Sequence, residues 1–276
     1  MFDSFMLNSW MVGTVIAVVA PVVGFFVVLR GDAFAAHAVP EAAFAGAAGA
    51  SLIGVDTLFG LGVAAMVAAV GIGLTAGRLR HDALTALVMT ALLGLGILFL
   101  SWTSTYTQQI YALLFGEPLG VSTNEIGATI AIGIVALVAI ACLYRPLLLT
   151  SVLPEVAAAR GISRRRIEIG FMVILALATT AAVPVVGALL MFSLTIGPPA
   201  AAIQLTRRPV PAIALSIGIA LVSVWFAIGA SYQTDWPIGF FVTAATFCWY
   251  VVARIMSVAA RTAMRTAVPR PTPTLP

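Results

Sequence analysis

Residues 24–46 read GFFVVLRGDAFAAHAVPEAAFAG and place charged side chains inside a strongly apolar stretch. One apolar run ends at Arg30, Asp32 follows after a single glycine, and His37 and Glu41 lie within the next apolar run. An ionisable side chain at the centre of a membrane span costs about 2.5–3.5 kcal/mol on insertion scales. Because such residues usually mark a functional pathway, this segment is the first candidate for a functional site.

The composition of the whole chain is that of a membrane protein. Hydrophobic residues make up 62% of the 276 residues and charged residues 9%, and the mean hydropathy is +1.11. Too few polar residues are present to coat a soluble domain. A bilayer core needs about 20 apolar residues per helical span, and helices satisfy their own backbone hydrogen bonds in lipid. The sequence therefore predicts an all-α, polytopic protein of the cytoplasmic membrane.

Apolar runs between charged residues predict about nine transmembrane helices. The expected spans are residues 10–29, 38–54, 57–77, 83–101, 124–144, 167–182, 185–205, 210–230 and 237–257. We expect residues 1–262 to form a single transmembrane domain, and the Pro-rich tail 263–276 to be disordered.

The arginines decide how two ambiguous segments are divided. Residues 31–77 and 167–206 each fit one long element or a hairpin, and we divide them at turns near Asp56 and Pro184. With both turns, all fourteen basic residues, which are arginines because the chain has no lysine, fall on one side. The positive-inside rule makes that side the cytoplasm. The amino terminus is then outside and the carboxyl terminus is cytoplasmic.

The absence of lysine also excludes some functions. A Walker A loop needs the pattern GxxxxGK[ST], so the chain has no ATPase site of its own and we do not expect it to be an enzyme. Any energy from ATP must come from another polypeptide. The arginines lie between apolar runs, where they act as topology signals, so nucleic acid is not an expected partner.

A short helix is expected on the cytoplasmic side within residues 151–166, SVLPEVAAARGISRRR. Pro154 and Glu155 are typical of a helix start, and Gly161 directly after Arg160 is typical of a helix stop. One interpretation is a helix that rests on anionic lipid headgroups. The other is a lever that docks into a separate, energy-supplying subunit.

Several segments, in this order, resemble the permease subunits of ABC transporters for zinc, manganese and chelated iron. The resemblance covers most of residues 10–255. Residues 24–46 are similar to the family signature GDAxSHAxLPG, and residues 148–168 to its coupling segment D-P-E-x-A-x-A-x-G, with Pro154, Glu155 and Gly161 in register. Further similar segments are RLRHDALTALVMTALLGLGILFLS (78–101), LLFGEPLGVSTNEI (113–126), LLMFSLTIGPPAAAIQLTRR (189–208) and SYQTDWPIGFFV (231–242).

The resemblance implies a division of labour among several proteins. An extracytoplasmic solute-binding protein would deliver a divalent metal ion (zinc, manganese or iron) or a metal chelate. Two permease chains, expected to be a homodimer, would form the path, and cytoplasmic ABC ATPase subunits would bind ATP and drive import. The permease would carry no cofactor of its own. Glu155, Gly161 and Arg164 would contact the ATPase.

The candidate metal ligands depart from the family pattern. The family aspartate and histidine are four residues apart, whereas Asp32 and His37 are five apart, about 140° around an ideal helix. When Pro40 is aligned with the family proline, Ala36 takes the place of the histidine and Glu41 that of a glycine. His37 and Glu41, four apart, provide a replacement face. We therefore expect Asp32, His37 and Glu41 as metal ligands, against an alternative in which Asp32 caps a helix and His37 is an interior residue.

Two other functions are compatible with the same residues. The altered signature allows the same ABC permease architecture with a non-metal cargo. A secondary transporter could instead couple import to protons through Asp32, His37 and Glu41. Inverted sequence repeats would favour the secondary transporter.

Overall fold

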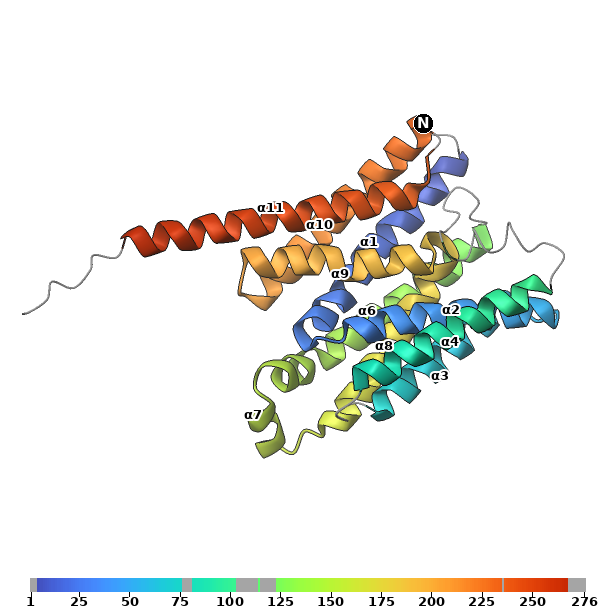
Figure 1. The fold of residues 1–276 in the computed structure, drawn as a ribbon, viewed down its shortest axis with the longest axis horizontal. Coiled ribbons are helices and arrows are strands. Elements are labelled where there is room, and N and C mark those ends of the chain that lie inside the picture. The colour runs from blue at the N-terminus through green and yellow to red at the C-terminus, as the bar shows by residue number, and fades with distance from the viewer. Residues whose placement is uncertain (1–3, 76–80, 103–113, 115–122, 235, 268–276) are drawn as a thin grey trace, which may run out of the picture.

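The computed structural model describes residues 4–75, 81–102, 114, 123–234 and 236–267, and every element in these ranges is a helix. Figure 1 shows long helices, most of them running side by side, with one short helix at an edge of the bundle. The described helices are α1 (Ser4–Arg30), α2 (Ala33–Leu52), α3 (Thr57–Thr75), α4 (His81–Ser101), α6 (Thr123–Val152), α7 (Pro154–Ala159), α8 (Arg164–Val186), α9 (Ala188–Leu205), α10 (Pro209–Thr234) and α11 (Ile238–Ala267).

The predicted spans correspond to nine long helices in the described part of the chain, which are all of its helices except α7. Six of these nine are long and apolar enough to cross a membrane: α1, α3, α6, α8, α10 and α11. The described apolar stretches of α4 and α9 are shorter, at 85–101 and 190–205. The helical, multi-pass character of the chain is confirmed, and nine crossings stay a prediction.

Two glycines make the sharp turns that separate consecutive helices. After α2 the chain turns through Gly54, at φ +72°, and the Asp56 carboxylate accepts a 2.8 Å hydrogen bond from the Phe59 N–H to begin α3. Pro184 remains inside α8, and the helix ends three residues later at Gly187, at φ +83°. A positive φ favours glycine, so α8 is ended by Gly187 and not by Pro184. Both expected turns are present, the second displaced from Pro184 to Gly187.

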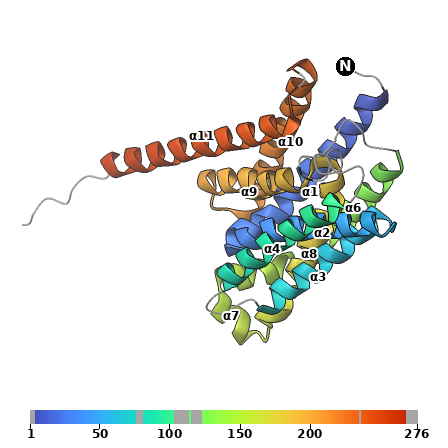
Figure 2. The ribbon, with the colours of Figure 1, turned by 45° about the vertical axis from the view of Figure 1, so that its right-hand side comes forward.

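Successive helices run in alternating directions, so one end of the bundle collects the arginine-bearing connections. Figures 1 and 2 show α7 at this end, beside the end of α1 and the start of α8, and far from the amino terminus. The connection between α9 and α10, which holds Arg207 and Arg208, lies on the same side. The assignment of this end to the cytoplasm, and with it the placement of both termini, stays a prediction.

The core surrounds α1 and α8, whose apolar windows are each 67% buried. Small residues allow close helix approach, as is usual between membrane helices. At Gly24 in α1, an added Cβ would meet the backbone carbonyl of Thr195 in α9, and Gly46 of α2 lies in the same way against Gly60 of α3. The first contact brings α1 close to α9, and the second holds α2 beside α3. The last helix, α11, continues to Ala267, beyond the domain boundary expected at residue 262.

Candidate functional site

Helix α2 carries an imidazole and a carboxylate on one face. It is rich in alanine and glycine, packs on α3, α4, α8 and α9, and is helical throughout despite Pro40. His37 and Glu41 are one turn apart, and Nε2 of His37 lies 3.1 Å from Oε1 of Glu41. His37 and Glu41 therefore lie together on one face of α2, as their four-residue spacing predicts.

The environment of this pair is partly enclosed. The Glu41 side chain is 4% exposed and the His37 side chain 27% exposed. The His37 ring lies against Phe192 of α9, with 4.7 Å between ring centroids. In the described part of the chain, neither Nδ1 of His37 nor Oε2 of Glu41 has a hydrogen-bond partner. Both are lone-pair donors of the kind that zinc and manganese accept, so the pair has unused coordinating capacity.

Asp32 lies apart from this pair. It occupies the N-cap position of α2 without capping the helix through its side chain, and its Oδ2 is 3.1 Å from Nε of Arg30. Because α2 is a regular helix from Ala33, the five-residue spacing leaves Asp32 off the face of His37. Among the described residues, no group of three His, Cys, Asp or Glu side chains is close enough to hold a metal ion. One chain thus brings together His37 and Glu41 but not Asp32.

Glu168 is a buried acidic residue that sequence reasoning missed. It lies in the second turn of α8, forms an ion pair with Arg30, and its side chain is 6% exposed, as is that of Arg30. Arg30 is in the last turn of α1, where a cation is favoured by the helix dipole. Glu168 is the only acidic residue of α8 and lies where the apolar part of this helix begins, after Arg164–Arg166. An acidic residue at the start of an apolar run requires a cationic partner, and this was the signal available in the sequence.

The coupling segment has the local structure that the sequence predicts. Pro154 begins α7, Glu155 is in its first turn, and Gly161 stands just beyond it at φ +71°. Ala157 is buried, while the predicted contact residues Glu155, Gly161 and Arg164 are exposed. A surface with these properties is accessible to another subunit; its contact with an ATPase stays a prediction.

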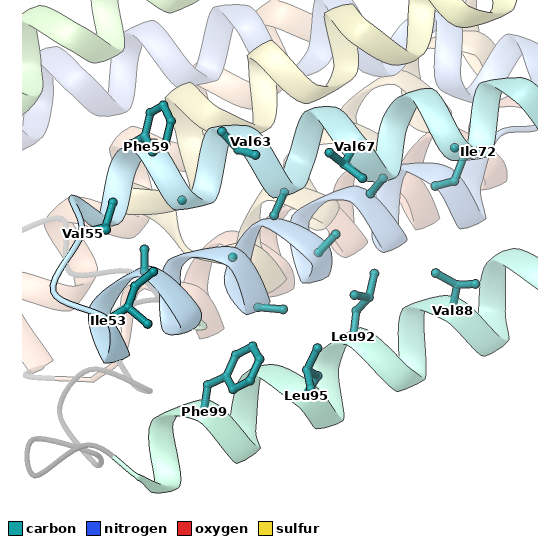
Figure 3. Close-up of a pocket in the computed structure, with 18 of the residues that line it drawn as sticks. Ile53, Val55, Phe59, Val63, Val67, Ile72, Val88, Leu92, Leu95 and Phe99 are labelled. Atoms are coloured by element: carbon teal, nitrogen blue, oxygen red, sulfur yellow. The ribbon is translucent and has the colours of Figure 1, made fainter.

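An apolar groove of about 800 Å³ lies between α3 and α4, with α2 as its floor. Figure 3 shows side chains such as Phe59, Val63, Val67 and Leu95 along its walls. None of the described residues that line it is ionisable. A hydrated cation would find no ligand there, so the groove is not the candidate site.

The fold and the charged residues within it define a polytopic helical membrane protein with the architecture of a transport permease. Comparison with known proteins makes this specific. The model of the ABC 3 transport family matches residues 2–257, and the chain belongs to that family.

Two individual proteins similar to this chain are membrane components of metal transport systems. The manganese transport system membrane protein MntC of Halalkalibacterium halodurans is 30% identical over 231 residues, covering 82% of this chain and 79% of that protein. The chelated iron transport system membrane protein YfeC of Yersinia pestis is 25% identical over 238 residues, covering 86% of this chain and 81% of that protein.

A solved structure has the same fold. It is PsaBC from Streptococcus pneumoniae in complex with Fab, which matches with a TM-score of 0.82 and 24% identity over 91% of each chain. At this level of identity the likeness concerns the fold alone.

Proposed function

We propose that this chain is the permease subunit of an ABC importer for a divalent metal ion or metal chelate. The observation that carries the proposal is the agreement of relatives aligned over about four fifths of both chains, which are named for manganese or chelated iron transport. A separate ATPase supplies the energy, since the chain has no lysine for a Walker A loop. A solute-binding protein delivers the cargo on the outer side.

His37 and Glu41 are the metal ligands in this proposal. Each chain contributes one imidazole nitrogen and one carboxylate oxygen, which is half of a four-coordinate site. In a two-fold symmetric pair of permeases each ligand occurs twice around the axis, so a second chain completes the site. Imidazole and carboxylate together suit zinc and manganese.

Asp32 is a third, separate contact on the same path. Five helical residues correspond to about 7.5 Å along the axis, so Asp32 lies nearer the arginine-rich end than His37 does. Its charge is already compensated by Arg30 at 3.1 Å, which makes it a weaker ligand than the open pair. We place it where the ion leaves the pair toward the cytoplasm.

The exposed segment around α7 is the contact with the ATPase. Glu155, Gly161 and Arg164 are the contact residues, and Gly161 stops the short helix so that the chain can return to α8. The alternative interpretation, in which Arg164 and its neighbours rest on anionic lipid, predicts that the purified chain associates with anionic vesicles but not with an ATPase.

The test is uptake of radioactive manganese by proteoliposomes that contain the permease, its ATPase and the binding protein. His37→Ala and Glu41→Gln should abolish ATP-dependent uptake. Asp56→Asn is the matched control, because it changes a carboxylate in a turn at the far end of the bundle and keeps an oxygen for the Phe59 N–H. Normal uptake by both site variants would remove the ligand assignment.

A proton-coupled secondary transporter is the second candidate, because a buried His–Glu pair within a span is also typical of proton relays. The two functions differ in their energy source. Uptake by the chain alone, driven by a proton gradient without ATP, would favour the secondary transporter. An ATPase that copurifies with the chain and is required for uptake would favour the importer. A different cargo would appear as ATP-dependent transport without a requirement for metal.

A further inference from the structure

Arg30 makes contacts with three separate parts of the bundle. Its Nε lies 3.1 Å from Asp32, in the turn between α1 and α2, and a terminal nitrogen is paired with Glu168 in α8. The other terminal nitrogen lies 3.4 Å from both the Thr150 and Ser151 hydroxyls, in the last turn of α6. One side chain that is 6% exposed thus joins α1, α6, α8 and the start of α2.

Two of these contacts flank the coupling segment. Ser151 and Thr150 lie two and three residues before the stretch 153–163, and Glu168 lies five residues after it. The guanidinium carbon also lies 5.3 Å from the centre of the Phe171 ring, one turn further along α8. Both ends of the coupling segment are therefore attached to the same cation.

The third contact leads to the candidate metal pair. Asp32 immediately precedes α2, which is a continuous helix through His37 and Glu41. A regular helix transmits an axial displacement over such a short distance because its backbone hydrogen bonds resist compression. An axial displacement of Asp32 would therefore be passed along α2 to His37 and Glu41.

The electrostatics favour movement of these parts as one unit. One guanidinium is shared between two carboxylates, and the side chains of Arg30 and Glu168 are both shielded from water. Separating Glu168 from Arg30 would leave a shielded carboxylate without its ion-pair partner, which is strongly unfavourable. Separating the end of α6 from Arg30 would break its contacts with the Thr150 and Ser151 hydroxyls. The planar guanidinium holds several acceptors in fixed directions, a geometry that a lysine cannot reproduce.

We infer that Arg30 is the positioning residue that transmits movement of the coupling segment to the metal pair on α2. This inference rests on the proposed function, in which an ATPase pushes the coupling segment within residues 151–166. The cation contacts neither His37 nor Glu41, and it is not among the residues proposed to contact the ATPase. It acts through Asp32 on one side and through Thr150, Ser151 and Glu168 on the other.

The experiment compares transport with ATP hydrolysis in the complete complex of permease, ATPase and binding protein in proteoliposomes. The variant is Arg30→Met combined with Glu168→Gln, which removes the link without leaving Glu168 charged and unpaired. The readout is manganese imported per ATP hydrolysed. We expect this ratio to fall about tenfold, within the range of about 5- to 150-fold typical of coupling between sites, while basal hydrolysis stays within about twofold.

The matched control is Arg254→Gln. It removes an arginine of α11 that is exposed and donates a single 3.3 Å hydrogen bond to Gln204. This variant should keep the ratio of the unmodified complex. An unchanged ratio in the assembled double variant would overturn the inference.

A second variant covers the case in which the double variant does not assemble. Arg30→Lys keeps the charge but not the simultaneous contacts, so it should lower the ratio to an intermediate value, and an unchanged ratio would again overturn the inference. The proposed function fails in a different way, through an unmodified complex that shows no ATP-dependent manganese uptake.

Discussion

Arg30 and Glu168 are 138 residues apart in the sequence and form an ion pair in which each side chain is only 6% exposed. The pair joins the end of α1 to the start of α8, where the chain returns from the coupling segment. Asp32 shares the same guanidinium at 3.1 Å. One guanidinium thus contacts two carboxylates, whereas each carboxylate makes its ion pair with the same Arg30, and this difference leads to the first prediction.

Arg30→Met should destabilise the protein more than Glu168→Gln. Removal of the cation takes away the ion-pair contact of both Glu168 and Asp32, and breaking a buried pair from one side costs about 3–5 kcal/mol. Glu168→Gln leaves Arg30 still paired with Asp32. Thermal unfolding of the purified protein in detergent measures both changes. The double variant should be more stable than Arg30→Met alone, and strictly additive losses would contradict this account.

Manganese should stabilise the purified permease through His37 and Glu41, in the two-chain assembly that we propose. At one hundred times its dissociation constant, a ligand that binds only the folded state raises the free energy of unfolding by about 2.7 kcal/mol. Thermal unfolding with manganese, and again after a chelator removes the ion, measures this gain. His37→Ala and Glu41→Gln should abolish the gain, while Asp56→Asn should retain it. A full gain in both site variants would show that the ion binds elsewhere.

Gly24→Ala should disrupt the contact between α1 and α9. The added Cβ would overlap the backbone carbonyl of Thr195, which cannot move aside as a flexible side chain can. We expect a loss of about 1–3 kcal/mol, typical of overpacking. Gly71→Ala in α3 is the control, since a Cβ there meets nothing within 4 Å and alanine favours a helix by about 1 kcal/mol. Equal unfolding temperatures for the two variants would argue against a tight crossing at Gly24.

Gly161→Ala should impair coupling more than folding. At φ +71° a residue with a Cβ is strained by about 1–2 kcal/mol, so the chain leaves α7 along a different path. We expect reduced binding of the ATPase to the purified permease, measured by copurification, with a normal unfolding temperature. Gly218→Ala, in α10 with open space around the glycine, should bind the ATPase normally. The prediction is wrong if both variants bind it equally.

The predicted orientation places position 56 outside and position 160 in the cytoplasm. Single cysteines introduced as Asp56→Cys and Arg160→Cys, with Cys142 and Cys248 replaced by serine, should react with an impermeant thiol reagent from opposite sides. Whole cells and inverted vesicles provide the two accessible sides. Labelling of both positions from the same side would refute the proposed topology.

The helices and the coupling segment could be predicted from local signals. Apolar runs between charged residues, with the two ambiguous runs divided near Asp56 and Pro184, indicated where each of the nine long helices lies. The start of α7 at Pro154 and its stop before Gly161 could be predicted because the residues that set each end are next to it in the sequence. The turn at Gly187 was placed three residues early, at Pro184, because a proline is tolerated near a helix end and the glycine that adopts a positive φ decides the break.

The candidate site was only half predictable. The four-residue spacing of His37 and Glu41 was sufficient to bring them together, because a helix places such residues on one face. Asp32 was grouped with them from the signature, although the regular start of α2 turns it toward Arg30. The assignment of its true partner required knowledge of which helices pack at that end.

Hydropathy and the positions of the arginines therefore define a polytopic helical membrane protein without reference to any long-range contact, because an apolar run of about 20 residues is enough to form a span. The choice of Glu168 as a partner for Arg30, and the resulting attachment of the coupling segment to α2, depend on α1, α6 and α8 packing together. No local pattern encodes a contact across 138 residues. It is favoured only once packing shields the charges from water, since an unpaired charge is then costly.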